Sequence, residues 1–397
     1  MGKKTQSPVP ATGFVQAAGE ALYDGAGDLL LLRGVNLGNW FVQEYWMNVS
    51  SVGKFETGIY TQKRGIAAME QNPNLTKAQI QALYDLYMQT YITERDFDEI
   101  AALNMNAVRV PFTYLNLTED GTVWREDAFR YLDWTIEQAK KRGLYVILDL
   151  HGGVGSQNQD HHSGDDGGFA LYPNKENREA TVAIWKAIAA RYRGEKTVAG
   201  YDFLNEPRRK KGRYAGKAQF DFYNELYRAV RAIDPDHMIF MECFTFPTHG
   251  VSPEKYGWKN VCYEYHIYNL TPFSQKTALR FYRFWHRFKR YRVPVFIGEW
   301  NAWGRDRDWR TTAEYFEKLG WSYCSWTYKT NAYNYTHGKV NNRNSWGLYE
   351  LQVEPVDVSA ATFEEIERAY RAMETTESAR THVYGFYEDF LKNRTAR

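Results

Sequence analysis

The stretch LYVILDLHG, residues 144–152, shows the unit from which this fold is built. Residues 144–150 form an apolar run of strand length, as expected for a strand that is covered on both faces. The amphipathic segments on either side, 126–141 and 175–192, are predicted to be helices. A strand that lies between two helices is typical of a parallel α/β fold.

The same alternation continues along the chain. The predicted strands are residues 29–35, 106–111, 144–150, 198–204, 237–242, 261–266, 295–299 and 321–326. The predicted helices are residues 93–103, 126–141, 175–192, 218–233, 275–291, 311–319, 362–375 and 384–393. Eight strands in this order favour a parallel (β/α)8 barrel over a doubly wound sheet.

We expect one domain over residues 1–397, because no repeat and no low-complexity linker divides the chain. A long insertion, 36–92, follows the first strand. The C-terminal segment, 356–397, holds the last two predicted helices, which we expect to cover the last strand. The helix that begins after Thr93 is predicted to have a capping box, with Asp96 in the place usually taken by Glu.

The composition excludes several classes of protein. Lys and Arg number 50 against 48 Asp and Glu, so the net charge of +2 gives no reason to expect nucleic acid or an anionic membrane as partner. No apolar run reaches the roughly 18 residues of a membrane span. No signal peptide is seen, which favours a cytoplasmic protein, or a secreted one whose signal has been removed.

Two further features concern cofactors and ligands. The three cysteines have no CxxC spacing and are expected to be small buried side chains, and the sequence predicts neither a cofactor nor a metal ion. Aromatic residues make up 16% of the chain, with 13 Trp and 30 Tyr. Such rings suit sugars, because a pyranose stacks its apolar face on a ring.

Polar residues gather at the ends of the predicted strands and not at their starts. They are Asn36, Arg109, His151, Asn205, Glu206, Glu242, His266, Tyr268, Glu299 and Trp326. Active sites of (β/α)8 barrels lie at this edge. Glu206 in FLNEP and Glu299 in FIGEW would point into the barrel mouth, and two carboxylates that flank a bond are what glycoside hydrolysis requires. The simpler explanation is that each Glu only forms an ion pair with a neighbouring Arg. That explanation suits an isolated Glu better than two Glu residues that are accompanied by Arg109, His151, Asn205 and His266.

Seven motifs in this order resemble glycoside hydrolase family 5. They are RGVNLGNW (33–40), AVRVPF (107–112), LDLHGGVGSQN (148–158), FLNEP (203–207), YHIY (265–268), FIGEW (296–300) and CSWTYK (324–329). The resemblance implies a retaining β-glycosidase on a (β/α)8 barrel, with Glu206 as acid/base and Glu299 as nucleophile. It also implies supporting roles around the sugar for Arg109, His151, Asn205, His266, Tyr268 and Trp326.

The two carboxylates are expected to differ in pKa. An ion pair with Arg109 and a hydrogen bond from Tyr268 would keep Glu299 ionised, and the charge of Glu299 would raise the pKa of Glu206. Glu206 would then start as an acid and act as a base once Glu299 is esterified. The expected separation of the carboxyl groups is about 5–5.5 Å, whereas about 9 Å would indicate inversion.

The run RGVNLGNWFVQEYWM (33–47) is similar to the exo-β-1,3-glucanase branch of the family, as is LHGGVGSQN (150–158). This resemblance implies an exo-acting enzyme on β-glucosides or β-glucans, with Glu44 binding the hydroxyls of the terminal sugar. Asn36 is a further site candidate. Aromatic residues of the insertion are candidate sugar platforms, although at least half are expected to pack the insertion onto the barrel. They are Trp40, Phe41, Tyr45 and Trp46.

The likeness to that branch breaks after Asn158. An ungapped register places His161 where the branch has Asp, and Asp160 fits that place only with a shift of one residue. Other readings therefore stay open: an endo-acting β-glucanase or cellulase, a β-mannosidase-type enzyme, and a barrel that binds glycans without catalysis. The loop DHHSGDDGG (160–168) has residue types found in metal-dependent hydrolases, though without helical His spacing. The basic run RRKKGR (208–213) could contact a polar or acidic aglycone.

Overall fold

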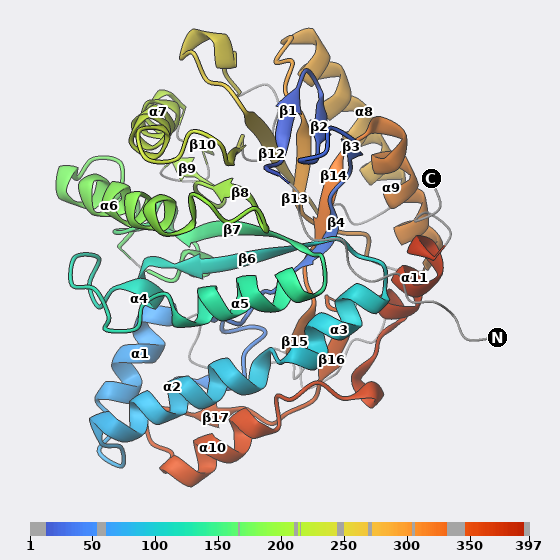
Figure 1. Ribbon diagram of the computed structural model, residues 1–397. Helices are drawn as coiled ribbons and strands as arrows, with labels where there is room; N and C mark the ends of the chain where they lie inside the picture. Colours follow the sequence, from blue (N-terminus) through green and yellow to red (C-terminus); the bar gives the residue numbers. More distant parts are fainter. Residues whose placement is uncertain are drawn as a thin grey trace.

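The computed structural model describes residues 13–53, 61–165, 167–209, 213–214, 216–243, 250–268, 272–303, 306–331 and 346–392. Its centre is a closed barrel of eight parallel strands, which confirms the predicted (β/α)8 fold (Figure 1). In barrel order the strands are β4 (Arg33–Asn36), β6 (Ala107–Thr113), β7 (Tyr145–Gly152), β8 (Val198–Asp202), β11 (Met238–Glu242), β12 (Val261–Tyr268), β13 (Val295–Asn301) and β14 (Ser322–Ser325). The barrel closes where Tyr323 of β14 pairs with Arg33 of β4.

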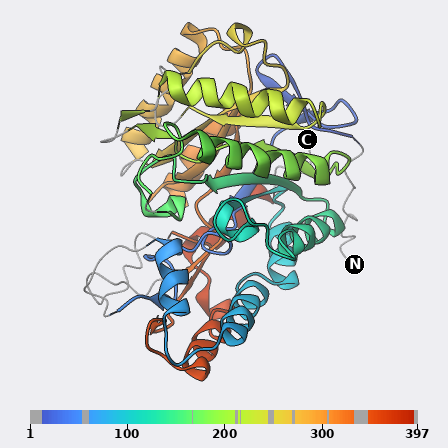
Figure 2. The same cartoon turned by 90° about the vertical axis from the view of Figure 1, so that its left-hand side faces the viewer.

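Helices surround the barrel, and Figure 2 shows α6 and α7 side by side on its outer surface. The helices that follow the barrel strands are α4 (Tyr114–Leu117), α5 (Arg130–Lys141), α6 (Lys175–Tyr192), α7 (Lys217–Arg231), α8 (Pro272–Phe288) and α9 (Asp306–Leu319). Helix α3 (Glu94–Ala102) precedes β6, and a carboxylate oxygen of Asp96 accepts a hydrogen bond from the Thr93 amide at 2.7 Å. The predicted cap of this helix is therefore confirmed.

Inward-facing residues follow one another at every second position of each strand, which divides the barrel interior into layers. The lower layer is apolar and includes Ala107, Ile147, Ala199, Phe240, Cys262, Phe296 and Cys324. Two residues further along, the inward positions of β6, β7 and β12 are Arg109, Asp149 and Glu264, all fully buried. The apolar layer therefore supports a charged layer directly beneath the barrel mouth.

The N-terminal strands close the lower end of the barrel. β1 (Gln16–Ala18), β2 (Ala21–Tyr23) and β3 (Leu29–Leu30) form an antiparallel sheet, and Val15, Leu22 and Leu32 pack against the apolar layer. The prediction of one barrel strand over residues 29–35 is thus wrong. Leu29 and Leu30 pair antiparallel with β2, and the chain enters the barrel only at Arg33. All three cysteines are buried and free, as predicted.

The insertion after β4 contains β5 (Ser50–Ser51), α1 (Gln62–Glu70) and α2 (Lys77–Tyr91). It packs with the C-terminal segment: β5 pairs with β17 (Val356–Asp357), and α10 (Phe363–Arg371) packs against α2. The two helices meet where the rings of Tyr87 and Tyr370 lie 5.0 Å apart. The expectation that both C-terminal helices cover the last strand is therefore wrong for α10.

The last helix, α11 (His382–Leu391), packs instead on the barrel side, where the rings of Phe386 and Trp309 of α9 lie 5.7 Å apart. Two small sheets complete the described structure. β9 (Arg208–Arg209) pairs with β10 (Arg213–Tyr214), and β15 (Lys329–Asn331) pairs with β16 (Tyr349–Leu351). Among the described residues, no helix combines the length and the apolar character needed to cross a bilayer.

Candidate active site

Glu206 and Glu299 face each other across the mouth of the barrel. Glu206 follows β8 and Glu299 lies in β13, the fourth and seventh strands of the barrel in chain order. One carboxylate oxygen of each, together with a ring nitrogen of His266, lie within 4.8 Å of one another. The structure thus brings together the two carboxylates that the sequence singles out, with one oxygen of each within 4.8 Å.

Glu299 is held from both sides. Its Oε1 accepts a hydrogen bond from Arg109 Nη1 at 3.0 Å, and its Oε2 accepts one from the Tyr268 hydroxyl at 2.6 Å. His266 Nδ1 lies 3.5 Å from the same Oε2. Burial raises the pKa of Glu299, and the opposing charges of His266 and Arg109 do not fully offset it. Arg109 and Tyr268 act in the expected direction, since each lowers this pKa, but burial outweighs them.

Arg109 is fully buried and connects most of the charged layer. Its partners are Asn36 and Asn205 through their amide oxygens, and Asp149, Asp202, Glu264 and Glu299 through carboxylate oxygens, at 2.8–3.4 Å. Four carboxylates raise the pKa of its guanidinium well above the usual value, although burial acts in the opposite direction. Asn36 is fixed in turn by donating to the carbonyl of Gly298 at 2.8 Å.

Asp149, Asp202 and Glu264 are not among the site residues predicted from the sequence. A pattern in the sequence could have identified them, because each is a charged residue inside an otherwise apolar strand. Gly298 makes room for one of them: a Cβ at this position would lie 1.4 Å from Glu264 Oε1. A glycine directly before Glu299 is therefore required by the packing of the charged layer.

His151, Asn205 and Trp326 form one wall of the mouth. His151 Nδ1 lies 2.6 Å from Asp149 Oδ2, and Asn205 Nδ2 lies 3.2 Å from His151 Nε2. Burial and then the charge of Arg109 hold the pKa of His151 well below its usual value. A neutral His151 donates to Asp149 and accepts from Asn205, and its ring stacks on Trp326 with centroids 5.4 Å apart.

The backbone at Glu206 adopts a left-handed conformation, with φ of +41°. Such a conformation is unusual for a residue with a side chain and persists only where the surroundings enforce it. Two side chains do so here. The amide of Glu206 donates to a carboxylate oxygen of Glu242, and its carbonyl accepts from Asn158 Nδ2 at 3.1 Å. Glu242, predicted only as a polar residue at a strand end, thus holds the backbone of Glu206 in place.

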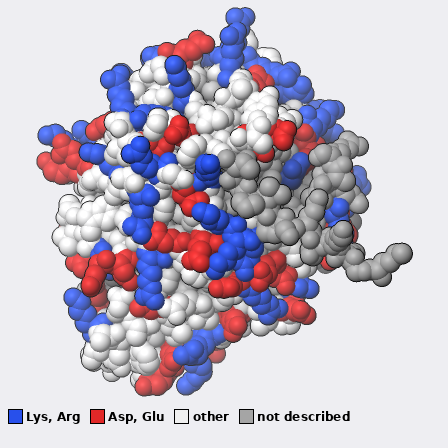
Figure 3. Space-filling view, viewed as in Figure 1, with Lys and Arg blue, Asp and Glu red and all other residues white. Residues whose placement is uncertain are grey.

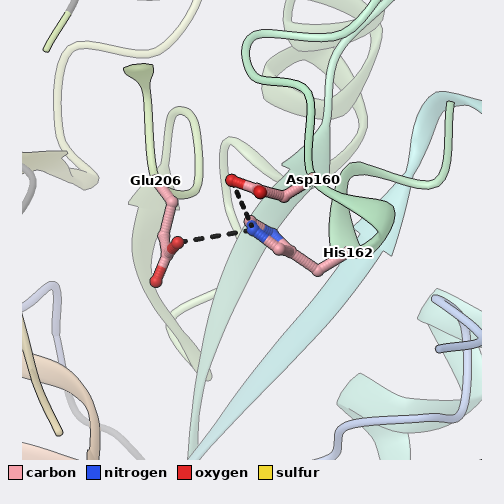
Figure 4. Close-up of side chains that lie close together, drawn as sticks. All are labelled: Asp160, His162 and Glu206. Carbon is pink, nitrogen blue, oxygen red and sulfur yellow. Dashed lines mark ion pairs between the residues drawn. The ribbon is translucent and has the colours of Figure 1, made fainter. Parts of the chain in front are cut away.

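Three cationic side chains contact the carboxylate of Glu206. Oε1 accepts from His266 Nδ1 at 3.0 Å, and Oε2 lies 3.1 Å from Arg208 Nη2. Oε2 also lies 3.4 Å from His162 Nε2, the contact drawn in Figure 4. Burial alone would raise the pKa of Glu206, but His162, His266 and Arg208 together bring it below its ordinary value. The expected rise in this pKa is therefore wrong, because three cations outweigh the charge of Glu299.

The segment after β7 supplies His162. It also shows which of the two candidates, Asp160 or His161, contacts Glu44. His161 Nε2 lies 2.9 Å from Glu44 Oε2, so the side chain that meets Glu44 is His161 and not Asp160. Asp160 instead forms an ion pair with Arg208 at 2.7 Å and lies 3.6 Å from His162 Nε2. Burial lowers the pKa of His162, but Glu206 and Asp160 raise it to about 9.

By residue type, the group formed by Asp160, His162 and Glu206 in Figure 4 could hold a metal ion. Its charges are already balanced within the protein, however. Arg208 pairs with both carboxylates, and His162 lies between them. A guanidinium in this position opposes a second cation, so the geometry favours an ion-pair network. Of the basic run 208–213, residues 210–212 lie outside the described residues.

Glu44 lies at the edge of the mouth, where it is almost fully buried. Its Oε2 accepts a hydrogen bond from Trp46 Nε1 at 2.7 Å, and the ring of Tyr45 meets that of His161 at 4.8 Å. Trp40 does not reach the site. It is fully buried and donates its indole N–H to the carbonyl of Met88, so its interpretation as a sugar platform is wrong.

Two tryptophans that were not predicted from the sequence lie beside Tyr268. The ring centroids of Trp303 and Trp346 are 4.1 Å apart, and those of Trp346 and Trp46 are 4.6 Å apart. Trp303 is 6.4 Å from Tyr268 by the same measure. A row of aromatic rings thus runs from Tyr268 to the insertion, built from four segments that are far apart in the sequence.

The fold and this constellation place the chain among the (β/α)8 barrels that carry a paired-glutamate site at the mouth. Residues 65–332 match the model of the family Cellulase (glycosyl hydrolase family 5), and the chain belongs to this family. The resemblance found in the motifs is confirmed by this match.

The relatives agree with this assignment. The chain is 30% identical over 268 residues to a beta-xylosidase of Phanerodontia chrysosporium, covering 66% of this chain and 53% of that protein. It is 31% identical over 281 residues to the probable glucan 1,3-beta-glucosidase A of Aspergillus clavatus, covering 68% of this chain and 65% of that protein. The chain thus spans little more than half to about two thirds of the length of these curated relatives.

Solved structures share the fold. A rutinosidase from Aspergillus niger superposes with a TM-score of 0.66 at 16% identity, over 86% of this chain and 98% of that one. An endoglucanase from the hyperthermophilic Thermotoga maritima gives a TM-score of 0.52 at 20% identity, over 85% and 96% of the two chains. At these identities the likeness concerns the barrel alone.

Proposed function

We propose that this chain is a retaining β-glycosidase that hydrolyses the O-glycosidic bonds of β-glucosides or β-glucans. The observation that carries the proposal is the close pair of carboxylates, with one oxygen each of Glu206 and Glu299 within 4.8 Å. Retaining glycosidases hold their two carboxyl groups about 5–5.5 Å apart, whereas inverting enzymes need about 6.5–9.5 Å to admit a water molecule.

In this proposal Glu299 is the nucleophile. Arg109 and Tyr268 each hold one of its oxygens, which fixes the rotamer and leaves lone pairs free to attack the anomeric carbon. Attack forms a glycosyl ester while Glu206 gives a proton to the leaving oxygen. In the second step Glu206 takes a proton from water, the water attacks the same carbon, and Glu299 leaves as a carboxylate.

The proton for the first step is shared between Glu206 and His266. Burial lowers the pKa of His266, but the charges of Glu242 and Glu299 raise it well above its usual value, so the imidazole is protonated at neutral pH. Its Nδ1 donates to Glu206 Oε1 at 3.0 Å. Movement of the proton along this hydrogen bond turns the ion pair into a neutral acid that can protonate the leaving oxygen.

Exo action from the non-reducing end is the mode that we propose. Glu44 is held by Trp46 and His161 at the edge of the mouth, where it can accept hydrogen bonds from the hydroxyls of a terminal sugar. The row of aromatic rings from Tyr268 to Trp46 offers apolar faces on the same side. The similarity to a probable glucan 1,3-beta-glucosidase supports this substrate class.

The test uses a panel of nitrophenyl β-glycosides and short β-glucans with three proteins: wild type, Glu299→Gln and Glu206→Ala. We expect wild type to release glucose one unit at a time and Glu299→Gln to be inactive on every substrate. Glu206→Ala should lose about 10²–10⁴-fold on substrates with poor leaving groups. It should keep far more activity on nitrophenyl glycosides, whose leaving group needs little protonation.

Azide tests the stereochemistry and the role of Glu206 together. Added to Glu206→Ala, it should yield a β-glycosyl azide, because the small anion enters the space of the missing carboxylate. An α-glycosyl azide would contradict retention, and release of longer oligosaccharides would contradict exo action. The substitution Glu254→Gln, at an exposed position, is the control and should leave all rates unchanged.

A further inference from the structure

Helix α8 presents an unusual outer surface. Large apolar side chains that are exposed number six among the described residues, and three of them lie on this helix. Phe281, Phe284 and Phe288 have 41%, 58% and 64% of their surface exposed. The helix also has an ordinary inner face, where Leu279, Tyr282 and His286 are buried. It therefore has two apolar stripes, and only one of them packs on the barrel.

The outer stripe is a continuous ridge of rings. Phe284 and Phe288 are one helical turn apart and stack with centroids 5.8 Å apart. Trp285 joins the ridge at 5.3 Å from Phe288 and 6.0 Å from Phe281. We call these four residues, Phe281, Phe284, Trp285 and Phe288, the aromatic ridge. A contiguous exposed apolar patch of this kind marks a surface that binds something apolar.

Positive charge lies beside the aromatic ridge. Segment 272–292 has no acidic residue and seven Lys or Arg, which are Lys276, Arg280, Arg283, Arg287, Lys289, Arg290 and Arg292. In the part of the chain that the structure describes, no carboxylate pairs with Arg280, Arg283 or Arg287. Together with Tyr315 and Lys318 of α9, they line an open hollow between the two helices.

Figure 3 shows Lys and Arg gathered at the upper right-hand edge of the molecule, where Figure 1 places α8. The net charge of the whole chain is only +2, because acidic residues elsewhere offset the Lys and Arg of this segment. The local charge is what a partner at this surface meets, since an ion pair beyond about 10 Å is largely screened at physiological salt.

We infer that the aromatic ridge and its flanking cations bind the surface of an anionic lipid bilayer. A helix with Phe and Trp on one stripe and Lys and Arg beside it is the form in which proteins enter the boundary between headgroups and acyl chains. The rings enter that boundary while the guanidinium and ammonium groups stay with the phosphates. The positive charge of the helix requires a negatively charged partner, and the aromatic ridge requires a partner with an apolar interior.

The arrangement of the rings distinguishes this partner from a single-stranded nucleic acid. Bases stack on the free faces of aromatic side chains along a groove that tracks the backbone. Here Phe284 and Phe288 stack on each other, so one face of each ring is already covered, although both rings border the open hollow beside α9. Exposed rings that cover each other's faces suit insertion between lipids better than the stacking of separate bases.

The topology leaves the catalytic mouth free in this mode of binding. Helix α8 follows β12 and runs back along the barrel toward the start of β13. Its second half, with Phe284 and Phe288, therefore lies toward the end of the barrel opposite to Glu299. Binding at the aromatic ridge does not depend on the proposed catalysis, and the two can be tested separately.

The experiment is co-sedimentation of the full chain with vesicles of phosphatidylcholine alone or of phosphatidylcholine mixed with phosphatidylserine. We expect binding to the mixed vesicles, little binding to phosphatidylcholine, and release when NaCl is raised to about 0.5 M. Two double variants, Phe284→Ser/Phe288→Ser and Arg280→Glu/Arg287→Glu, should each bind about ten-fold more weakly or worse. The charge control Lys186→Glu/Arg193→Glu, on and after α6, makes the same change in net charge and should bind like wild type, as should the apolar control Val123→Ser.

Several outcomes would overturn the inference. One is the absence of binding to the mixed vesicles, and another is equal weakening by the control variants. Binding to a single-stranded oligonucleotide without binding to vesicles would assign the surface to nucleic acid instead. Self-association that Phe284→Ser/Phe288→Ser abolishes, with no vesicle binding, would assign it to a second copy of the chain. Unchanged circular dichroism and unchanged rates on a nitrophenyl glycoside show that the variants are folded.

Discussion

At the scale of single residues, the chemistry of the site depends on the charges around Glu206. Its carboxylate contacts His266, Arg208 and His162, and these cations hold its pKa low despite burial. Of these cations, His162 has a pKa that Glu206 and Asp160 raise to about 9. His162 is therefore the group through which pH and mutation can change the acidity of Glu206 without touching Glu206 itself.

We predict that His162→Gln raises the pKa of Glu206, because a neutral amide replaces an imidazolium 3.4 Å from Oε2. The acid form of Glu206 then persists to higher pH. The alkaline limb of the kcat/KM profile should move upward by on the order of one pH unit, the effect of one nearby opposite charge. His161→Gln is the control, since His161 contacts Glu44 and should leave that limb in place. A limb that stays, or moves to lower pH, would contradict this role of His162.

Gly298 provides a second prediction at this scale. In Gly298→Ala the new methyl group would lie 1.4 Å from Glu264 Oε1, so Glu264 has to move away from Arg109. We expect a loss of about 1–3 kcal/mol in the free energy of unfolding, measured by chemical denaturation. In Gly194→Ala the added carbon meets nothing within 4 Å, and stability should change by less than about 0.5 kcal/mol. Equal effects of the two substitutions would show that Glu264 is not held in the way described.

The sequence was sufficient to identify the members of the site that follow strands directly. Glu206, Glu299 and Arg109 stand at the ends of apolar runs, and a parallel barrel brings all such ends together. The pKa order of the two carboxylates could not be predicted. It depends on His162 and Arg208, which follow two different barrel strands, β7 and β8, and meet only in the folded chain.

At the scale of elements, local patterns predicted most helices and strands within a few residues. The helix over residues 175–192 was predicted with the bounds that the structure has. Helix α5 begins at Arg130 and not at residue 126, because residues 126–129 form turns that the apolar pattern does not reveal. The two helices of the insertion were missed, although α2 begins with a recognisable capping box of Thr76 and Gln79.

That capping box carries a prediction at this scale. The Thr76 hydroxyl accepts from the Gln79 amide at 3.3 Å, and Gln79 Oε1 accepts from the Thr76 amide at 2.9 Å. Thr76→Ala removes the first of these bonds at an exposed helix end, so the free energy of unfolding should fall by about 1 kcal/mol. Thr76→Ser keeps the hydroxyl and should restore most of this loss. If serine and alanine behave alike in denaturant titrations, the cap does not stabilise α2.

At the scale of the whole molecule, the barrel, the insertion and the C-terminal segment meet at Lys329. This side chain is fully buried in β15. Its Nζ donates to the carbonyl of Tyr91 at the end of α2, to the carbonyl of Met373 at 2.8 Å and to the hydroxyl of Thr375 at 2.9 Å. The Tyr91 ring lies 4.4 Å from the same nitrogen. One buried cation therefore joins three parts of the chain that are far apart in sequence.

Burial lowers the pKa of Lys329 from 10.5 to about 8. Between these two values the unfolded chain keeps a proton that the folded chain has lost, so the contribution of Lys329 to stability rises with pH across this window. A neutral amine still has donors for the carbonyls of Tyr91 and Met373. We therefore expect wild type to gain stability relative to Lys329→Met between about pH 7 and about pH 10.

Comparison with Lys329→Met cancels the titration of the many buried tyrosines, which both proteins share. At about pH 7 the variant should already be less stable by about 1–3 kcal/mol, because carbonyl oxygens of Tyr91 and Met373 lose their donor. Denaturant titrations at the two pH values give the difference directly. A difference that is constant with pH would mean that Lys329 titrates as it does in water, and a difference that shrinks would mean that its charged form is the one the fold prefers. Either result would contradict a lowered pKa and with it the assignment of Lys329 as a desolvated junction between the barrel, the insertion and the C-terminal helices.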